Sequence, residues 1–343
     1  GASTSVSPGA TTTYYAEAVT SNGCRSASRT AVTLTVNPLP AAPSPVTANP
    51  SSICSGFSSN LVGTSVNNTI RWYTVASGGT SIGNSASGGN FSVAPTATQI
   101  YYADALTPQG CISATRNPVT VTVKALPTPT FSSPFVATVC QGDDNIVYTT
   151  EPSQSNYQWT ISGGIITSGG GTGNNTATVT WTTAGTGSIS VNYTNSNGCT
   201  AVSPTTRAVT VHPKPGNPIT STPYSGCGVA NVTANVGTNG TTCRFYGPNS
   251  LNTFISSGTS IVVSLLGTNT YYISSYNATT GCEGNRVPVS VTVGPTFSLS
   301  IVGSNYNGSG VSCPGGTNGT ATATSNATDY PIEYAWSNGT TNV

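Results

Sequence analysis

Short runs of alternating apolar and polar residues recur along the chain, and each run predicts a β-strand. In residues 119–123 valine alternates with threonine, so one face would carry the valines and the other the threonines. This follows because successive side chains of a strand point to opposite faces. The same alternation returns at 32–36 and 289–293. The pattern therefore predicts half-buried strands whose outer faces are neutral and polar.

These strands belong to a longer unit that repeats. Residues 101–127 read YYADALTPQGCISATRNPVTVTVKALP, and residues 14–40 read YYAEAVTSNGCRSASRTAVTLTVNPLP. The unit returns at 271–295, and a looser copy covers 191–215. Each copy holds an aromatic strand, a turn that ends in Gly-Cys, and an alternating strand that closes on proline. A unit that recurs at domain-sized spacing indicates an array of modules and not one globule.

We therefore predict an all-β protein of tandem β-sandwich domains arranged end to end and joined by proline-rich, semi-rigid linkers. Residues 40–125 and 214–294 form complete modules of the first type, and 126–213 form a module of a second type. Residues 1–39 are the C-terminal half of a first-type module, and 295–343 are the N-terminal half of a third type. Because both ends cut through a module, we expect the chain to be a window on a longer polymer.

The composition argues against two classes of binding partner, nucleic acids and membranes. Only 5% of the 343 residues are charged and the net charge is +1, so there is no basic patch for nucleic acid and no polybasic membrane anchor. No apolar run approaches about 18 residues, which argues against membrane insertion. The chain is still able to bury strand faces, because it has 16 Tyr together with many Val and Thr.

The nine cysteines predict disulfides. There is no CxxC pair, and His212 is the only histidine, so a zinc site is disfavoured. Regular and widely spaced cysteines in sandwich modules indicate an oxidising compartment, so we expect an extracellular protein.

Each complete module has an opening and a closing cysteine, which we call the opener and the closer. We expect three bridges, each inside one module: Cys54–Cys111, Cys140–Cys199 and Cys227–Cys282. Such a bridge would stabilise its module by roughly 4 kcal/mol in the chain-entropy model. Cys24, Cys243 and Cys313 are then left without partners in the chain. For Cys243 the favoured interpretation is a buried small apolar side chain. The alternative is an intermolecular bridge.

No motif predicts catalysis, a cofactor or a metal. Residues 79–83 match GxSxG, but that nucleophile elbow needs a strand-to-helix turn and a histidine partner, and His212 lies in another module. Asp143-Asp144 are interpreted as solvated loop acids, with a weak Ca²⁺ site as the alternative. The glycine-rich residues 169–173 lack a following GK[ST] and predict a hairpin connection. We therefore expect no enzyme in this segment.

The four tryptophans leave one binding function open. Trp72 and Trp159 are expected in module cores, whereas Trp181 and Trp336 are not assigned. If tryptophans formed an exposed row, they would stack on sugars.

Three patterns resemble known families. The first-type modules resemble the Ig-like modules of Bacteroidetes surface and gliding-associated proteins, through the openers Cys54 and Cys227, the strands RWY and RFY, and the YYA…GC…VTVTV ending. Residues 126–213 resemble a PKD-like module through YQWTISGG, GTGNNTATVTW and NSNGC. Residues 295–343 are similar to the start of a SprB-type repeat of gliding-motility adhesins through CPGGTNGTATA and YAWSNG.

The resemblance implies type IX secretion and exposure on the surface of a Gram-negative Bacteroidetes cell, held at the outer membrane or released as a filament. We therefore expect a non-catalytic stalk or filament segment of a long adhesin, with copies of itself or other surface proteins as partners. The alternative is an array of carbohydrate-binding modules attached to a secreted enzyme, with surface polysaccharide as partner. An exposed aromatic row would favour that alternative, whereas a self-complementary face would favour a filament.

Overall fold

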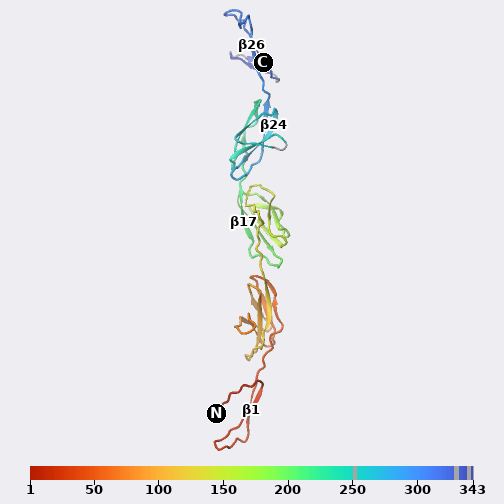
Figure 1. The fold of residues 1–343 in the computed structure, drawn as a ribbon, viewed down its shortest axis with the longest axis vertical. Helices are drawn as coiled ribbons and strands as arrows, with labels where there is room; N and C mark the ends of the chain where they lie inside the picture. The colour runs from red at the N-terminus through yellow and green to blue at the C-terminus, as the bar shows by residue number, and fades with distance from the viewer. Residues whose placement is uncertain (250–252, 328–331, 338–340, 343) are drawn as a thin grey trace.

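The computed structural model describes residues 1–249, 253–327, 332–337 and 341–342. It is a row of separate β units that follow one another along a single long axis (Figure 1). The described residues contain strands and no helix, and therefore no apolar helix long enough to span a membrane. The prediction of an all-β protein of tandem β-sandwiches arranged end to end is confirmed.

The first sandwich, Val46 to Lys124, packs a three-stranded sheet on a five-stranded one. The smaller sheet has the order β3-β5-β8, and the larger has β4-β10-β9-β6-β7. The strands are β3 (Val46–Asn49), β4 (Ser52–Cys54), β5 (Ser59–Gly63), β6 (Thr69–Tyr73), β7 (Gly83–Ala86), β8 (Asn90–Val93), β9 (Gln99–Leu106) and β10 (Asn117–Lys124). Trp72 is fully buried between the sheets and stacks on Phe91, with ring centroids 6.1 Å apart.

The alternating valines and threonines of β10 lie on opposite faces of the strand, as predicted from the sequence. Val121 is fully buried, and Val119 and Val123 pack against the same core. Thr120 and Thr122 are exposed on the other face. Burying one face of each strand therefore fixes the register of the sheet.

The third sandwich, Ile219 to Gly294, has the same topology as the first. Its sheets have the orders β18-β20-β23 and β19-β25-β24-β21-β22. The strands are β18 (Ile219–Thr220), β19 (Tyr224–Cys227), β20 (Ala230–Asn235), β21 (Thr242–Tyr246), β22 (Phe254–Gly258), β23 (Ser260–Val263), β24 (Gly267–Tyr276) and β25 (Val287–Gly294). Phe245 takes the place of Trp72, and Cys243 is 1% exposed in the same core.

The second sandwich, Thr138 to His212, is built differently. Its sheets have the orders β12-β15-β14 and β11-β17-β16-β13, so the larger sheet has four strands and not five. The strands are β11 (Thr138–Cys140), β12 (Ile146–Thr149), β13 (Ser155–Ser162), β14 (Gly164–Gly169), β15 (Thr176–Trp181), β16 (Gly185–Thr194) and β17 (Thr205–His212). Trp181 is fully buried at its centre.

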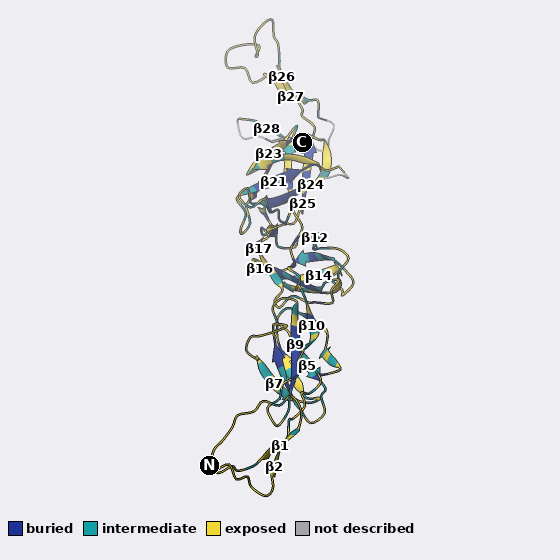
Figure 2. Ribbon diagram, turned by 60° about the horizontal axis from the view of Figure 1, so that its bottom comes forward, coloured by how far each residue is buried: buried dark blue, intermediate teal, exposed yellow. Residues whose placement is uncertain are grey.

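The end units are built from two-stranded sheets. They consist of β1 (Thr12–Ala16) with β2 (Thr30–Leu34), β26 (Leu299–Gly303) with β27 (Ala321–Ser325), and β28 (Tyr334–Ala335) with β29 (Thr341–Asn342). In Figure 2 the buried residues lie inside the three sandwiches, whereas β1, β2, β26 and β27 are mostly exposed. Parts of the motif compared with a SprB-type repeat, at 328–331 and 338–340, lie outside the described residues.

Candidate functional site: disulfide bridges between sandwiches

Both disulfides of the structure cross from one sandwich to the next. Cys54 of the first sandwich bonds Cys199 of the second, with their Cα atoms 5.7 Å apart. Cys140 of the second bonds Cys282 of the third, with a Cα separation of 5.6 Å. The predicted pairing inside each module, Cys54–Cys111, Cys140–Cys199 and Cys227–Cys282, is therefore wrong. Cys111 and Cys227, which we expected in bridges, carry free thiols, as do Cys24, Cys243 and Cys313.

Strand direction explains the error. In the first sandwich β4 runs parallel to β10 and places Cys54 beside Lys124, at the end where the chain leaves. The closer Cys111 follows β9, which runs antiparallel to β10 and ends near Asn117, at the opposite end. The eight residues of β10 span about 23 Å at roughly 3.3 Å per residue. A disulfide needs Cα atoms within about 7 Å, so one sandwich cannot bridge its own opener and closer.

The same geometry brings neighbours together. The exit ends of the first and second sandwiches each carry an opener and face the entry end of the following sandwich, which carries a closer. At the second junction β11 runs parallel to β17 and sets Cys140 beside His212, just before the linker to the third sandwich. Openers therefore meet the closers of the following sandwich.

Hydrogen bonds reinforce the first junction. Lys124 Nζ donates to Asn197 O at 3.1 Å, and Asn195 Nδ2 donates to Ala125 O at 3.2 Å. Asn195 also orders the turn that presents the closer, because its Oδ1 accepts from the amide of Cys199 at 3.1 Å. One of the chain's two lysines thus serves this contact.

The second junction is packed closely against its linker. The amide of Asn277 donates to Cys282 O at 2.8 Å and closes the turn, and Cys282 is fully buried. A Cβ added at Gly284 would lie 2.6 Å from Pro215 O in the linker, so only glycine fits there. On the other side, Asp143 Oδ2 accepts from the amide of Cys140 at 2.7 Å. This acid therefore caps the strand that carries the opener.

The remaining sequence candidates are not brought together. Residues 79–83 cover the end of the connection from β6 and the first residue of β7, whereas His212 lies at the end of β17 in another sandwich. Residues 169–173 lie at the end of β14 and in its connection to β15. Within the described ranges, no three His, Cys, Asp or Glu residues are grouped as a metal site would require.

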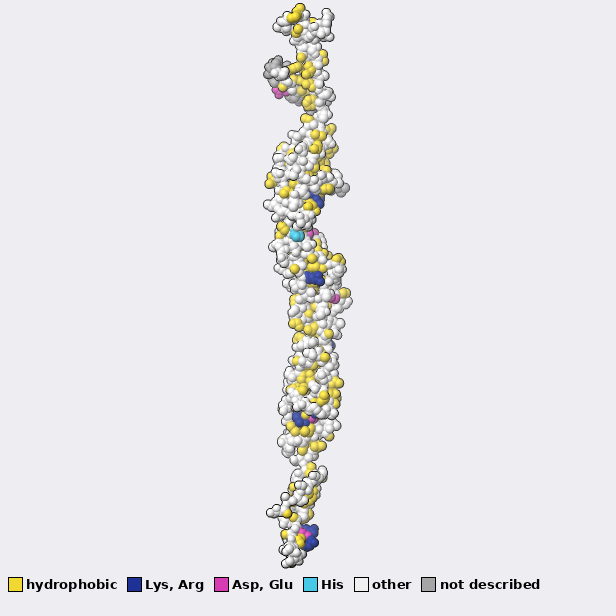
Figure 3. Space-filling model, turned by 60° about the vertical axis from the view of Figure 1, so that its left-hand side comes forward, with side chains coloured by type: hydrophobic (Ala, Val, Ile, Leu, Met, Phe, Trp, Pro, Cys, Tyr) yellow, Lys and Arg dark blue, Asp and Glu magenta, His cyan; other side chains and the backbone are white. Residues whose placement is uncertain are grey.

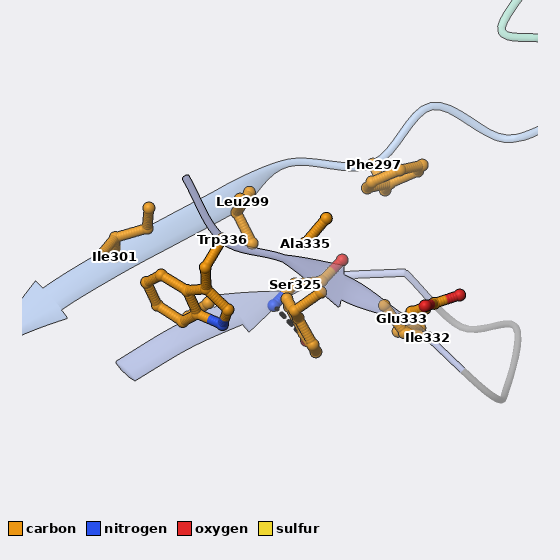
Figure 4. A pocket seen from close by; sticks show the side chains of 10 residues that line it. Phe297, Leu299, Ile301, Ser325, Ile332, Glu333, Ala335 and Trp336 are labelled. Carbon is orange, nitrogen blue, oxygen red and sulfur yellow. Dashed lines mark hydrogen bonds between the residues drawn. The ribbon is translucent and has the colours of Figure 1, made fainter. Parts of the chain in front are cut away.

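The tryptophans are mostly interior. Trp72 and Trp181 are fully buried. Trp159 packs partly buried against the second core, and its indole N–H donates to Asn174 O at 2.9 Å. Trp336 is half-buried and lines a shallow hollow with Leu299 and Ile301 (Figure 4). No row of exposed tryptophans forms in the part of the chain that the structure describes.

Sequence reasoning missed a charged cluster on the larger sheet of the first sandwich. Asp104, 2% exposed, accepts from Arg71 Nε at 2.8 Å and from Arg71 Nη2 at 2.9 Å. Arg116 lies 3.5 Å from the same carboxylate, and its guanidinium stacks 3.2 Å from the centroid of the Tyr73 ring. Arg116 also donates to Val75 O at 2.9 Å, so the cluster ties the connection after β6 to the sheet.

The third sandwich holds an equivalent cluster around Glu283. Its carboxylate accepts from Arg244 at 3.0 Å, from Ser274 at 2.6 Å and from the Tyr246 hydroxyl. Burial opposes ionisation, but these hydrogen bonds outweigh it and lower the pKa of Glu283. The Arg286 guanidinium stacks 3.7 Å from the Tyr246 ring centroid, as Arg116 does on Tyr73.

The two clusters place the acid at different sequence positions. Asp104 lies on β9, where the third sandwich has Ser274, whereas Glu283 follows the closer turn, where the first has Ile112. In the N-terminal unit Glu17 pairs with Arg25 and Arg29. A signal was available, because an arginine stands 15 residues after the first tyrosine in the three first-type modules (29 − 14, 116 − 101 and 286 − 271).

These clusters hold six of the chain's seven arginines in ion pairs, with two arginines on each acid. In Figure 3 the charged side chains are isolated spots on a surface of neutral polar and hydrophobic atoms. The junctions, and not a charged face, are therefore the features that distinguish this chain.

Comparison with known proteins agrees with the fold. Residues 1–38, 40–124 and 215–295 match the family model described as "Ig-like domain CHU_C associated". No curated protein matches the chain.

Solved structures similar to the chain share little sequence with it. The fibronectin(III)-like modules of Clostridium thermocellum CbhA are 18% identical, with a TM-score of 0.30 over 49% of this chain and 95% of that one. A Ca²⁺-stabilised adhesin that helps an Antarctic bacterium reach out and bind ice is 14% identical, with a TM-score of 0.35 over 82% and 81%. A 1.5-MDa bacterial ice-binding adhesin is 14% identical, with a TM-score of 0.28 over 73% and 98%.

Proposed function

The chain belongs to the family of CHU_C-associated Ig-like domains, and from this premise we propose that it is a non-catalytic stalk segment of a cell-surface adhesin. The observation that carries the proposal is the position of the two disulfides. Each crosses a junction between sandwiches, and neither lies inside one.

A second covalent link changes the mechanics of a junction. Neighbouring domains joined by one linker peptide are expected to move relative to each other. Here each junction between two sandwiches has the linker peptide and a disulfide at a second point, so hinge motion about the linker is opposed. Hydrogen bonds such as Lys124 to Asn197 O add to this restraint. A row of sandwiches joined in this way suits a spacer that keeps its length.

The alternative of a carbohydrate-binding array has less support. Trp72 and Trp181 fill cores, and Trp159 is partly buried against one. The arginines that could contact acidic sugars are engaged in the clusters around Asp104 and Glu283. A spacer function uses the buried residues as they are placed, whereas sugar binding would need them exposed.

The finer assignments rest on the sequence motifs. We propose residues 126–213 as a PKD-like module, through YQWTISGG and NSNGC, and residues 295–343 as the start of a SprB-type repeat. Type IX export, a part in gliding or adhesion, and assembly with copies of itself or other surface proteins belong to the same proposal.

Small-angle X-ray scattering of the 343-residue chain tests the stalk. Replacing both Cys54 and Cys199 by serine should shorten the maximum dimension and broaden the distance distribution, because the first junction becomes flexible. Cys24→Ser is the matched control, since Cys24 is exposed and unbridged. Circular dichroism should show unchanged strand content in both. If the double variant scattered like the parent, the bridges would not set the shape and the proposal would fail.

A further inference from the structure

Two free cysteines occupy the same repeat positions as the bridged ones. Cys111 is the closer of the first sandwich, in a turn where the amide of Thr107 donates to Cys111 O at 2.9 Å. The bridged closer Cys199 sits in the same kind of turn, closed by Asn195 at 2.8 Å. Cys227 is the opener of the third sandwich, at the end of β19. One closer and one opener are thus built as in the bridges but remain unpaired.

The surroundings of Cys111 indicate where its partner would come from. Its Sγ lies 3.9 Å from Asn37 O, in the unit that contains β1 and β2. Asn37 follows the alternating strand of that unit as Lys124 follows that of the first sandwich. Lys124 is the strand neighbour of the bridged opener Cys54. The Cys111 thiol therefore faces the place where the preceding unit would present its opener.

Cys227 stands at the exit end of the third sandwich, in the position that the bridged openers have in the other two. β19 runs parallel to β25 and sets Cys227 beside Gly294, at the exit end of the third sandwich, where its thiol is exposed. Cys54 and Cys140 have this position at the two bridged junctions. The one cysteine beyond residue 282 is Cys313, in the loop between β26 and β27, which Figure 1 shows away from the third sandwich.

We propose that Cys111 and Cys227 each supply one sulfur of a further disulfide between neighbouring units. With the two bridges observed, these disulfides form a continuous series along one polypeptide, which we call the ladder. Cys111 bonds the opener cysteine of the unit before it, and Cys227 bonds the closer cysteine, in a Gly-Cys turn, of the unit after it. Every sandwich then has one bridge at its entry end and one at its exit end. The inference rests on the stalk proposal, but its test measures thiols and not shape, so the two can fail separately.

The chemistry is thiol–disulfide exchange. Two cysteine thiols lose two protons and two electrons to an oxidised dithiol of the secretion compartment, such as a disulfide oxidoreductase. One S–S bond forms in the ladder, and the S–S bond of the oxidant is reduced to two thiols. The two bridges already present require an oxidant of the same class.

Peptide mapping of the full-length protein from its native source, alkylated with iodoacetamide before denaturation and kept unreduced, tests the ladder. Peptides containing Cys111 and Cys227 should be recovered in disulfide links within one chain. Cys227→Ser should then leave its former partner as one new alkylated cysteine. Cys243→Ser is the matched control, because it removes a buried thiol and should expose none.

Two outcomes would overturn the proposal. One is quantitative alkylation of Cys111 and Cys227 while Cys54–Cys199 stays intact. The other is a link from either cysteine to a second copy of the chain, seen as a doubled mass that reduction removes.

Discussion

The first and second sandwiches differ in almost every interior feature but share their junctions. The first has a five-stranded sheet, a core around Trp72 and a buried charged cluster at Asp104. The second has a four-stranded sheet and a core around Trp181, and its Arg207 lies 5.1 Å from the Phe135 ring centroid, in no such cluster. Yet both present an opener beside the last residues of their final strand. The chain therefore varies how each unit is held together and keeps constant how units are joined.

The largest effect is expected from breaking the feature that only the first of these two sandwiches has. Asp104→Ala leaves Arg71 and Arg116 without their buried counter-ion and should destabilise the first sandwich by about 3–5 kcal/mol. Hydrogen exchange of peptides from β9 and β10 should rise strongly, while those from β16 and β17 should not change. Asp144→Ala, an exposed loop acid, is the control. Equal protection in both variants would show that the cluster is not structural.

A converse substitution should destabilise the core of the second sandwich alone. A Cβ at Gly187 would lie 2.4 Å from the Trp181 ring and 2.9 Å from Ser162 O. Gly187→Ala should therefore destabilise the second sandwich by about 1–3 kcal/mol through overpacking. Urea unfolding followed by tryptophan fluorescence measures it, with Gly173→Ala as the control, because nothing lies within 4 Å of a Cβ there. An unshifted transition in Gly187→Ala would contradict the packing described.

Acid should lower the stability of the second sandwich and so increase its difference from the first. Burial raises the pKa of Glu151, but hydrogen bonds from Thr130 and Thr150 outweigh it and lower the pKa from 4.5 to about 2. A lowered pKa gives stability that is present above about pH 4.5 and is lost as the pH falls towards 2. Allowing for solvent screening, we expect a loss of about 1–2 kcal/mol in the second sandwich. Thermal unfolding of Glu151→Gln should lack this dependence. A parallel pH profile in the variant would refute it.

The smallest effect is expected from the bridges themselves. A disulfide inside one sandwich would contribute roughly 4 kcal/mol to its unfolding free energy. Because the observed bridges join separate cores, reduction should change the unfolding free energy of each sandwich by less than about 1 kcal/mol. Calorimetry with and without reductant measures this. A drop of several kcal/mol would instead indicate bridges within sandwiches.

Much of the fold could be predicted from the sequence because strand alternation is a local signal. The burial of Val121 and Trp72, and the all-β class, follow from it. Disulfide partners are not local. Pairing Cys54 with Cys199 requires knowing that β4 runs parallel to β10 and that the closer turn lies at the other end. The spacing of cysteines along the chain carries neither fact.

The charged clusters were not predicted from the sequence, for a related reason. The acid pairs with arginines at the same repeat position, Arg71 and Arg244, but it stands at two different repeat positions itself, Asp104 on β9 and Glu283 after the closer turn. Comparison of the first and third sandwiches position by position therefore finds Asp104 opposite Ser274 and suggests no function that the two share. The arginines keep their positions because their long side chains stack on Tyr73 and Tyr246, which are fixed in the strands.

The two cystine loops overlap, and this limits how far the chain can be drawn out under tension. Residues 140–199 belong to both loops, so the shortest covalent path from Cys54 to Cys282 crosses one bridge, runs backwards through that segment and crosses the other. That path contains 59 residues (199 − 140) in place of 228 (282 − 54). At about 3.5 Å per residue, its contour length is roughly 200 Å against roughly 800 Å. Even with all three sandwiches pulled open, the oxidised chain would yield only about a quarter of its reduced extension between these points.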